Sequence, residues 1–194
     1  MKENFEIEID GSSPLFDKTG MDYREFPSDF TRIRHYTMEL IRTAPSGIRG
    51  FNLLEQQISE IIKNAVKHGN NNDPNKIVRI WYKLTLETAH LIVEDQGEGF
   101  KDLEKWNVFN RKRLQCINEQ QADHLGDYVS FRGANSDNFD GGNALFAAVE
   151  YWNLGMVFNE KRNAVAIKRR FNVSKDTSVE DVLSDITPWD VDRF

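Results

Sequence analysis

Apolar residues between positions 53 and 69 recur at intervals of three and four, the spacing that predicts an amphipathic helix. Gly69 and the polar residues 70–74 after it end this pattern. Glu60 and Asn64 lie four residues apart and therefore point from the same face of the helix. Such a pair is either an ordinary solvated face or part of a site that holds a metal and orients a nucleophile. The buried stripe consists of Leu53, Leu54, Ile58, Ile61, Ile62, Ala65 and Val66, and the polar side also carries Gln57 and either Lys67 or His68.

The rest of the chain divides into strand-like and helix-like segments. Alternation predicts strands over 5–9, 76–86 and 89–94, the last two joined through a turn, and a closing hairpin over 156–158 and 164–168. Helical spacing predicts helices over 29–43, with Ser28 as the N-terminal cap, over about 102–119 and over 143–152. We expect residues 15–27 to be irregular and residues 44–47 to break the chain. Two helices followed by an antiparallel hairpin predict an α+β layered fold rather than a parallel, doubly wound sheet.

Composition narrows the class of protein. The chain has 194 residues, a formal net charge of −6 and one cysteine, with 39% hydrophobic and 29% charged residues. The length and composition predict one globular domain, and a change to acidic composition after Phe171 predicts that it covers 1–171 and is followed by an acidic tail over 172–194. The negative charge argues against nucleic acid or an anionic membrane as a partner. The single cysteine and the lack of an apolar run long enough to span a bilayer predict a cytoplasmic protein.

A second candidate site lies where the strand over 89–94 ends. Asp95, Gly97 and Gly99 form a D-x-G-x-G sequence. The two glycines allow a flat or charged ligand to approach the backbone closely, and the aspartate offers oxygens that accept a hydrogen bond from an amino group. Because an aspartate before a glycine turn often only ends a strand, the motif is informative mainly in combination with the helix face.

Together, in this order and spacing, the two motifs resemble those of the GHKL ATPases, the Bergerat-fold superfamily of histidine kinases, heat-shock chaperones and type II topoisomerases. The helix segment is similar to the S-E-x-x-x-N-A-x-x-H-G signature of a small stand-alone branch, the anti-sigma-factor serine/threonine kinases. The matching residues are Ser59, Glu60, Asn64, Ala65, His68 and Gly69, and the resemblance covers roughly residues 25–170. It implies a two-layer α/β sandwich with a mixed, mostly antiparallel sheet and helices on one face.

The resemblance also implies a role for each motif residue. Asn64 matches the asparagine that holds Mg²⁺ against the nucleotide phosphates, and Glu60 matches the base that accepts a proton from the attacking hydroxyl or water. Asp95 matches the aspartate that bonds the adenine amino group, with Gly97 and Gly99 leaving room for the ring. One amide is a poor magnesium ligand, so we expect the phosphates to supply the rest and Mg²⁺ to bind together with ATP.

The segment after the glycine turn departs from the family pattern in two ways. An insertion over about 101–140 stands where these kinases usually have a shorter ATP lid, and Arg132 is its best-placed cation for a phosphate. The second glycine box reads Gly142-Asn143-Ala144-Leu145, preceded by Gly141, and has alanine where the family has glycine. Either Gly141 and Gly142 have taken over the phosphate-binding turn, or the methyl group of Ala144 lowers the affinity for a triphosphate.

Two functions fit this sequence. The first is an ATP-binding regulator similar to the anti-sigma-factor kinases, which uses Mg-ATP to phosphorylate a serine or threonine of a regulatory partner of the sigma-factor or anti-sigma-antagonist type. The second is a non-catalytic nucleotide-binding switch that acts by binding its partner. Glu60 favours the enzyme, because a pure binding protein needs no base, whereas Ala144 and the long insertion favour the switch. A homodimer is compatible with either function. A third interpretation, an α/β domain with a fortuitous glycine motif, leaves the order of the motifs unexplained.

Overall fold

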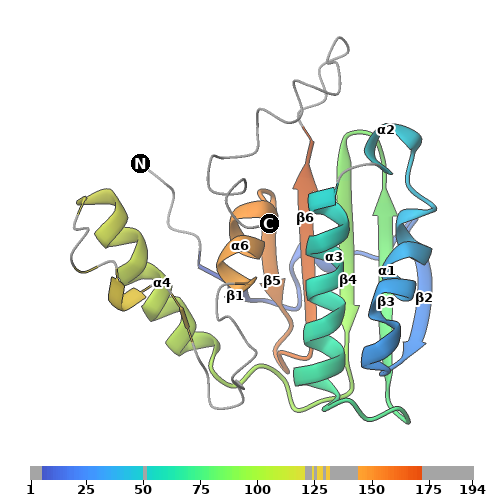
Figure 1. The fold of residues 1–194 in the computed structure, drawn as a ribbon, viewed down its shortest axis with the longest axis horizontal. Helices are drawn as coiled ribbons and strands as arrows, with labels where there is room; N and C mark the ends of the chain where they lie inside the picture. The colour runs from blue at the N-terminus through green and yellow to red at the C-terminus, as the bar shows by residue number, and fades with distance from the viewer. Residues whose placement is uncertain are drawn as a thin grey trace.

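The computed structural model describes residues 6–49, 52–120, 124, 126–128, 130–131 and 144–171. These residues form one six-stranded sheet with the order β1-β5-β6-β4-β3-β2 (Figure 1). Neighbouring strands are antiparallel except at one edge, where β1 pairs in parallel with β5. The bounds are β1 Glu8–Ile9, β2 Asp22–Pro27, β3 Ile77–Leu84, β4 Thr88–Glu94, β5 Gly155–Phe158 and β6 Ala164–Arg170. The sheet is therefore mixed and mostly antiparallel, as predicted.

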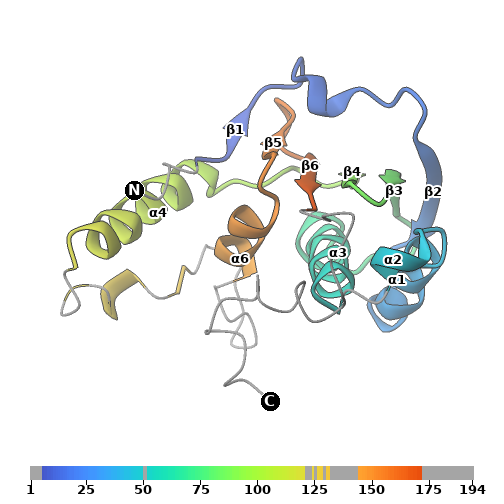
Figure 2. The same cartoon turned by 90° about the horizontal axis from the view of Figure 1, so that it is seen from above.

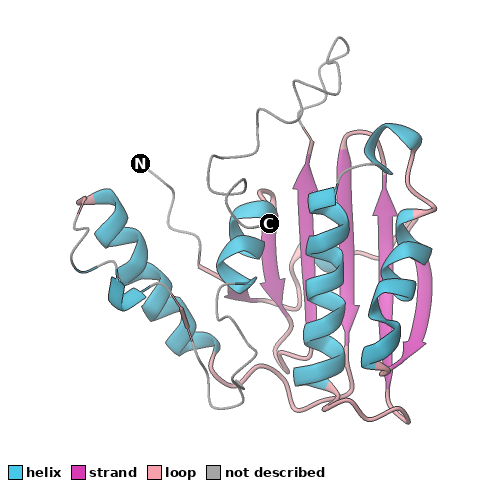
Figure 3. Ribbon diagram, in the orientation of Figure 1, coloured by secondary structure: helices cyan, strands magenta, loops and turns pink. Residues whose placement is uncertain are grey.

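Most of the helices cover one face of this sheet (Figure 2). This layer contains α1 (Ile33–Ile41), α2 (Ser46–Arg49), α3 (Asn52–Asn64) and α6 (Ala144–Tyr151), while α4 (Leu103–Asn118) lies beyond the β1 edge. Short helical turns are η1 (Pro14–Phe16), η2 (Phe30–Arg32), η3 (Ala65–Gly69) and η4 (Gly126–Tyr128). Figure 3 shows the resulting two layers, helix in front of strand, which confirm the predicted α+β fold. Among the described residues, no helix is both long enough and apolar enough to cross a lipid bilayer.

The opposite face of the sheet is crossed by residues 10–21, which run from β1 to β2 (Figure 2). His90 Nε2 lies 2.8 Å from the carbonyl oxygen of Leu15, and Lys18 Nζ lies 3.3 Å from the centre of the Trp81 ring. This segment thereby attaches to the centre of the sheet and leaves the helix-bearing face free to build the core.

The core lies between the sheet and helices α1, α3 and α6, and the predicted apolar stripe of α3 faces it. Leu54, Ile58 and Ile62 are fully buried, and the alternate residues of β3 and β4 that point toward them are buried as well. The helix ends in the π-helical turn η3, in which the N–H of Asn70 bonds to the carbonyl of Ala65 at 2.8 Å. Gln57, predicted on the polar side, is instead buried.

The expectation that residues 15–27 are irregular is wrong for their second half, where β2 pairs with β3 from Asp22 opposite Tyr82 to Pro27 opposite Ile77. Within β2 only Phe26 is buried, because β2 is an edge strand. An edge strand with one buried side chain shows no period-two hydrophobic pattern, so the sequence gives little sign of it. The expected break over 44–47 also differs, since the short helix α2 begins at Ser46.

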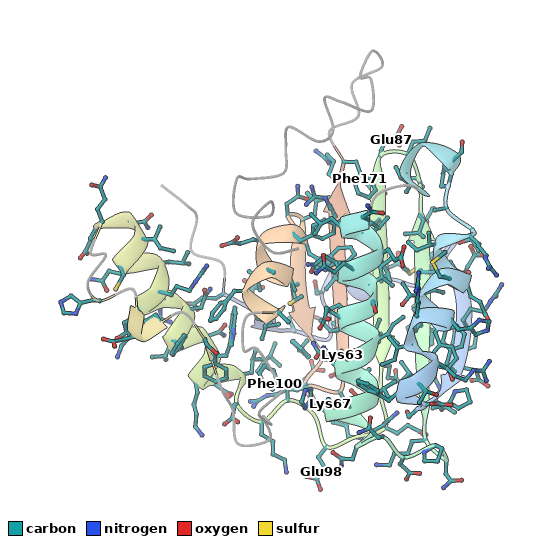
Figure 4. All side chains as sticks on the ribbon, in the orientation of Figure 1. Lys63, Lys67, Glu87, Glu98, Phe100 and Phe171 are labelled. Carbon is teal, nitrogen blue, oxygen red and sulfur yellow. The ribbon has the colours of Figure 1, made fainter. Side chains whose placement is uncertain are left out.

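The predicted cap at Ser28 is wrong as well. The carboxylate of Asp29 caps the first helical turn by accepting from the N–H of Thr31 at 2.9 Å, whereas Ser28 is buried and its hydroxyl accepts from Asn70 Nδ2 at 2.6 Å. The predicted helices over 102–119 and 143–152 correspond to α4 and α6. At the other end, the N–H of Phe171 bonds to the carbonyl of Glu87 in the β3–β4 turn (Figure 4), and the predicted acidic tail over 172–194 lies outside the described residues.

Candidate functional site

Four of the predicted site residues line one cavity of about 560 Å³. Glu60 and Asn64 reach it from α3, and Asp95 and Gly99 reach it from the turn after β4. Further lining residues come from η3, from the first turns of α4, from the start of α6 and from the β5–β6 hairpin. They are Ile61, Lys63, Ala65, His68, Gly69, Val93, Phe100, Lys101, Asp102, Lys105, Trp106, Phe131, Ala144, Leu145, Met156, Phe158, Arg162, Asn163 and Val165.

The polar face of α3 presents the carboxylate of Glu60, the ammonium group of Lys63 and the amide of Asn64 to this cavity. Lys63 Nζ lies 3.3 Å from Glu60 Oε1 and 3.2 Å from Glu60 Oε2, so the ammonium group spans both carboxylate oxygens. Asn64, one residue further on, makes no capping hydrogen bond to η3 with its side chain. The predicted pair Glu60 and Asn64 therefore does share a face, with Lys63 between them in the sequence.

Asp95 occupies a partly desolvated position at the end of β4. Burial raises the pKa of its carboxyl group to about 6, while the N–H of Gly97, which donates to Oδ1 at 2.7 Å, acts to lower it. A carboxylate that has lost part of its hydration and retains accepting capacity is well suited to bind a donor such as an exocyclic amino group.

Close backbone approach shapes this corner of the cavity. A Cβ atom on Gly69 would lie 2.2 Å from Asp95 Cγ, and one on Gly97 would lie 2.0 Å from the carbonyl oxygen of Gly69. Gly99 has φ +88° and a Cβ there would lie 1.9 Å from the carbonyl oxygen of Lys161. Side chains at these positions would displace backbone or the carboxylate, so the glycines are required by the packing around Asp95.

Two asparagines that were not predicted as site residues hold the glycine turn in place. Asn70 is fully buried; its Nδ2 donates to Ser28 Oγ at 2.6 Å and to the Ile77 carbonyl at 3.0 Å, and its Oδ1 accepts from the Gln96 N–H at 2.7 Å. This one side chain links the end of η3, the end of β2, the start of β3 and the residue after Asp95.

The second asparagine, Asn163, acts from the β5–β6 hairpin. Its Nδ2 donates to the Asp95 carbonyl at 2.7 Å, and the Asp95 N–H donates to the Asn163 carbonyl at 2.9 Å. Asn159 supports it in turn, with Nδ2 donating to Asn163 Oδ1 at 3.0 Å. The backbone of Asp95 is thus fixed on one side by a neighbouring hairpin, and asparagine-rich turns were the available sequence signal for it.

Cations surround the cavity, and each forms an ion pair with a nearby carboxylate. Besides Lys63 with Glu60, the described pairs are Lys101 with Glu98, Lys105 with Asp102 and Arg162 with Glu104. No sequence motif singled out these four cations. Their convergence depends on how α4 and the β5–β6 hairpin meet, which no local motif encodes.

Aromatic side chains form part of the wall. Trp106 is almost fully buried, with its ring centre 5.3 Å from that of Phe146, and the Phe100 and Phe158 ring centres are 6.1 Å apart. An apolar wall beside a carboxylate and a set of cations offers surfaces for a flat ring and for anionic groups in the same cavity.

The donor set around the cavity limits how a metal could bind. Within the described residues, no group of three or more histidine, cysteine, aspartate or glutamate side chains could hold a metal ion. Asn64 supplies a single neutral oxygen, which fits Mg²⁺ only if most of its ligands come with an anionic partner such as a polyphosphate. The predicted residues Arg132, Gly141 and Gly142 lie outside the described part of the chain, while Ala144 begins α6 at the cavity.

Comparison with known proteins identifies the family of this chain. A family model described as a histidine kinase-like ATPase domain matches residues 27–126, just over half of the 194-residue chain. The chain belongs to the histidine kinase-like ATPase family. Membership in this family implies that the domain binds a nucleotide, and the match spans both motif segments, from α3 to the glycine turn after β4.

Shorter matches connect this ATPase domain to regulatory proteins. The chain is 46% identical over 48 residues to the anti-sigma F factors of Geobacillus stearothermophilus and Geobacillus kaustophilus (strain HTA426), and 42% identical over 48 residues to that of Shouchella clausii (strain KSM-K16). Each match covers 25% of this chain and 33% of the relative. The chain therefore aligns with about a third of the length of these curated relatives.

Proposed function

We propose that this ATPase domain binds Mg-ATP and phosphorylates a serine or threonine of a partner protein that regulates a sigma factor. The observation that supports it best is the presence of Glu60, Asn64, Asp95 and Gly99 around one cavity of about 560 Å³. The similarity to anti-sigma F factors supports a regulatory partner of the sigma-factor or antagonist type. We also assign the protein to the cytoplasm, in keeping with its single cysteine.

Recognition of the adenine ring of the nucleotide is assigned to Asp95. Its ionised carboxylate accepts a hydrogen bond from the adenine amino group, and the glycines at 69, 97 and 99 allow the backbone to pack closely around Asp95. Guanine would present a carbonyl oxygen to the same carboxylate, and two acceptors repel each other. The site therefore selects adenine over guanine.

The phosphates are assigned to the end of the cavity near Asn64. When bound, Mg²⁺ neutralises part of the phosphate charge, and Asn64 is the residue that would hold it. Lys63 and the first turn of α6, which begins at Ala144, also line the cavity. The segment over 101–140 acts as the lid, and its first part, α4, is joined to the β5–β6 hairpin through the pair of Arg162 and Glu104.

The transfer step is assigned to Glu60. The hydroxyl oxygen of the partner's serine or threonine forms a bond to the γ-phosphorus, and the bond from phosphorus to the β,γ-bridging oxygen breaks, so that ADP leaves with the electron pair. Glu60 accepts the hydroxyl proton. Positioning of the nucleophile and charge neutralisation account for most of the rate of such a transfer, so one base and one metal ligand on a rigid helix are sufficient.

A non-catalytic switch is the second candidate, and two observations favour it. Ala144 places a methyl group at the first residue of α6, on the cavity wall, and the Glu60 carboxylate is engaged by Lys63 rather than free to accept a proton. In this alternative, nucleotide binding alone would control affinity for the partner.

Phosphate transfer from labelled ATP separates the two functions. The purified chain is incubated with Mg²⁺, ATP labelled in the γ-phosphate and a candidate antagonist protein, and the label on serine and threonine is measured for wild type and Glu60→Gln. The kinase assignment predicts label on the partner with wild type and a loss of roughly a hundredfold with Glu60→Gln. Nucleotide-dependent binding of the partner without any label would favour the switch.

A further inference from the structure

We infer that Lys63 distinguishes a nucleoside triphosphate from a diphosphate in this site. Its ammonium group leaves the Glu60 carboxylate and binds the terminal phosphate, and this exchange also frees Glu60. The inference rests on the proposed function, because it takes the cavity to hold an adenine nucleotide with its phosphates toward α3.

The position of Lys63 on α3 supports this role. Residues 60, 63 and 64 lie on one face of the helix, since neighbours three and four apart are adjacent on its surface. Glu60, Lys63 and Asn64 all line the cavity. Figure 4 shows Lys63 on the side of α3 that faces Phe100, a residue of the opposite wall. A cation at this position lies beside both the assigned base and the assigned metal ligand.

The present partner of Lys63 can be exchanged at little energetic cost. The side chains of Lys63 and Glu60 are 33% and 30% exposed, and the pair spans one helical turn. Solvent-accessible pairs of this kind contribute little to stability, because water and salt screen them. A terminal phosphate carries more negative charge than a carboxylate and has three acceptor oxygens. It would therefore compete successfully with Glu60 for the ammonium group when the cavity is filled by nucleotide.

The other cations around the cavity are less suited to sense the terminal phosphate. Lys101 and Lys105 have side chains that are 65% and 77% exposed and extend from the α4 side. Arg162 makes two hydrogen bonds to Glu104, one of them 3.1 Å from Nη1 to Oε2, and joins the hairpin to α4. Among these four cations, Lys63 is the one on the helix that carries Glu60 and Asn64.

The exchange would couple recognition to chemistry. With a diphosphate, or without nucleotide, Lys63 stays on Glu60 and the carboxylate is engaged. With a triphosphate, Lys63 moves to the terminal phosphate, and Glu60 becomes available to accept the hydroxyl proton of the partner. The base would then be released only when there is a phosphoryl group to transfer.

Calorimetric titration with ADP and with a non-hydrolysable ATP analogue, both with Mg²⁺, tests this inference. Lys63→Met should weaken binding of the triphosphate analogue by roughly tenfold, the usual effect of losing a charge-assisted hydrogen bond, and leave ADP affinity within about twofold. The unchanged ADP affinity also shows that the variant is folded. Lys101→Met is the matched control, because Lys101 lines the same cavity and also pairs with a carboxylate three residues earlier. It should leave the ratio of the two affinities unchanged.

A double variant separates direct contact from simple charge neutralisation. If Lys63 binds the terminal phosphate, Glu60→Gln with Lys63→Met binds the triphosphate analogue roughly tenfold more weakly than Glu60→Gln alone. If Lys63 only neutralises Glu60, the double variant binds the triphosphate analogue as tightly as Glu60→Gln alone, and the inference is overturned. An unchanged triphosphate-to-diphosphate ratio in Lys63→Met would also overturn it. Failure of wild type to bind either nucleotide would instead refute the proposed function itself.

Discussion

The backbone of Gly69 lies against the carboxylate of Asp95, so closely that a Cβ atom at residue 69 would be 2.2 Å from Asp95 Cγ and 2.3 Å from Oδ2. The contact joins the two motifs that are separate in the sequence, since Gly69 ends the helical turn after α3 and Asp95 follows β4. The position of the assigned adenine-binding group therefore depends directly on how the central helix ends.

Replacement of Gly69 by alanine should displace Asp95 and weaken adenine-nucleotide binding by roughly tenfold or more, with a loss of about 1–3 kcal/mol in the free energy of unfolding from overpacking. Nucleotide titration and urea denaturation measure the two effects. Gly126→Ala is the control, because a Cβ atom at residue 126 would meet no atom within 4 Å. Normal nucleotide affinity in Gly69→Ala would show that the contact does not position the site.

The raised pKa of Asp95 predicts how stability depends on pH. The carboxyl group has a pKa of about 6 in the folded protein, against 3.8 for an aspartate that is not buried. The folded state therefore binds this proton more tightly than the unfolded state does. Protonation of Asp95 therefore stabilises the folded protein. This stabilisation is fully present below pH 3.8 and is lost as pH rises through about 6. Asp95→Asn should therefore be more stable than wild type above pH 6, by on the order of 1–3 kcal/mol, with little difference near pH 4.

Urea denaturation of the ligand-free wild type and Asp95→Asn proteins across this pH range measures that difference. Asparagine keeps an oxygen that can accept from the Gly97 N–H, which makes it the appropriate substitution. A destabilised Asp95→Asn protein at neutral pH would indicate that the carboxylate is held by stabilising contacts, and that it is not kept desolvated for a ligand.

The assignment of Glu60 as the base predicts a separation of binding from catalysis. Glu60→Gln should reduce phosphoryl transfer by roughly a hundredfold or more and should not weaken nucleotide binding, because glutamine keeps the shape but cannot accept the proton. Single-turnover assays and equilibrium titration are both needed. Should the substitution abolish ATP affinity while transfer per bound nucleotide stays normal, Glu60 has a structural role.

The buried Asn70 network predicts a loss of stability at a residue that touches no nucleotide in this account. Asn70→Ala leaves the Gln96 N–H and the Ile77 carbonyl without their side-chain partner and should lower the free energy of unfolding by about 2–4 kcal/mol. Asn75→Ala is the control, since Asn75 is exposed and its side chain bonds only to Asp73 among the described contacts. Equal stability of the two variants would show that the network is dispensable.

The sequence predicted most of the elements that carry periodic patterns and missed those that do not. An exception is the alternation over 5–9, because among the described residues of that segment only Glu8–Ile9 forms a strand. The apolar stripe of α3 and the alternation in β3 and β4 reflect one buried face each, so both elements were predicted correctly. Strand β2 has one buried residue and was missed, because an edge strand needs no continuous apolar face. The hydrophobic pattern of a segment thus identifies a helix or strand only when one whole face of that element is buried.

The same limit applies to the site. Glu60, Asn64, Asp95 and Gly99, which the structure brings to one cavity, were singled out because they belong to short motifs with fixed spacing. Asn70 and Asn163 were not singled out as site residues, although both bond to the turn around Asp95. Their roles come from long-range contacts, and in a sequence they look like any asparagine in a turn. The Lys63–Glu60 pair was visible in principle from its three-residue spacing, but its importance depends on the cavity beside it.

Binding of adenine nucleotide through Asp95 underlies the other roles assigned to this cavity, and calorimetric titration with Mg-ATP and Mg-GTP tests it. We expect affinity for ATP in the micromolar range, much weaker binding of GTP, and a loss of roughly tenfold or more in ATP affinity in Asp95→Asn, because the adenine amino group would lose its acceptor. Equal affinity of wild type and Asp95→Asn for ATP would contradict the claim.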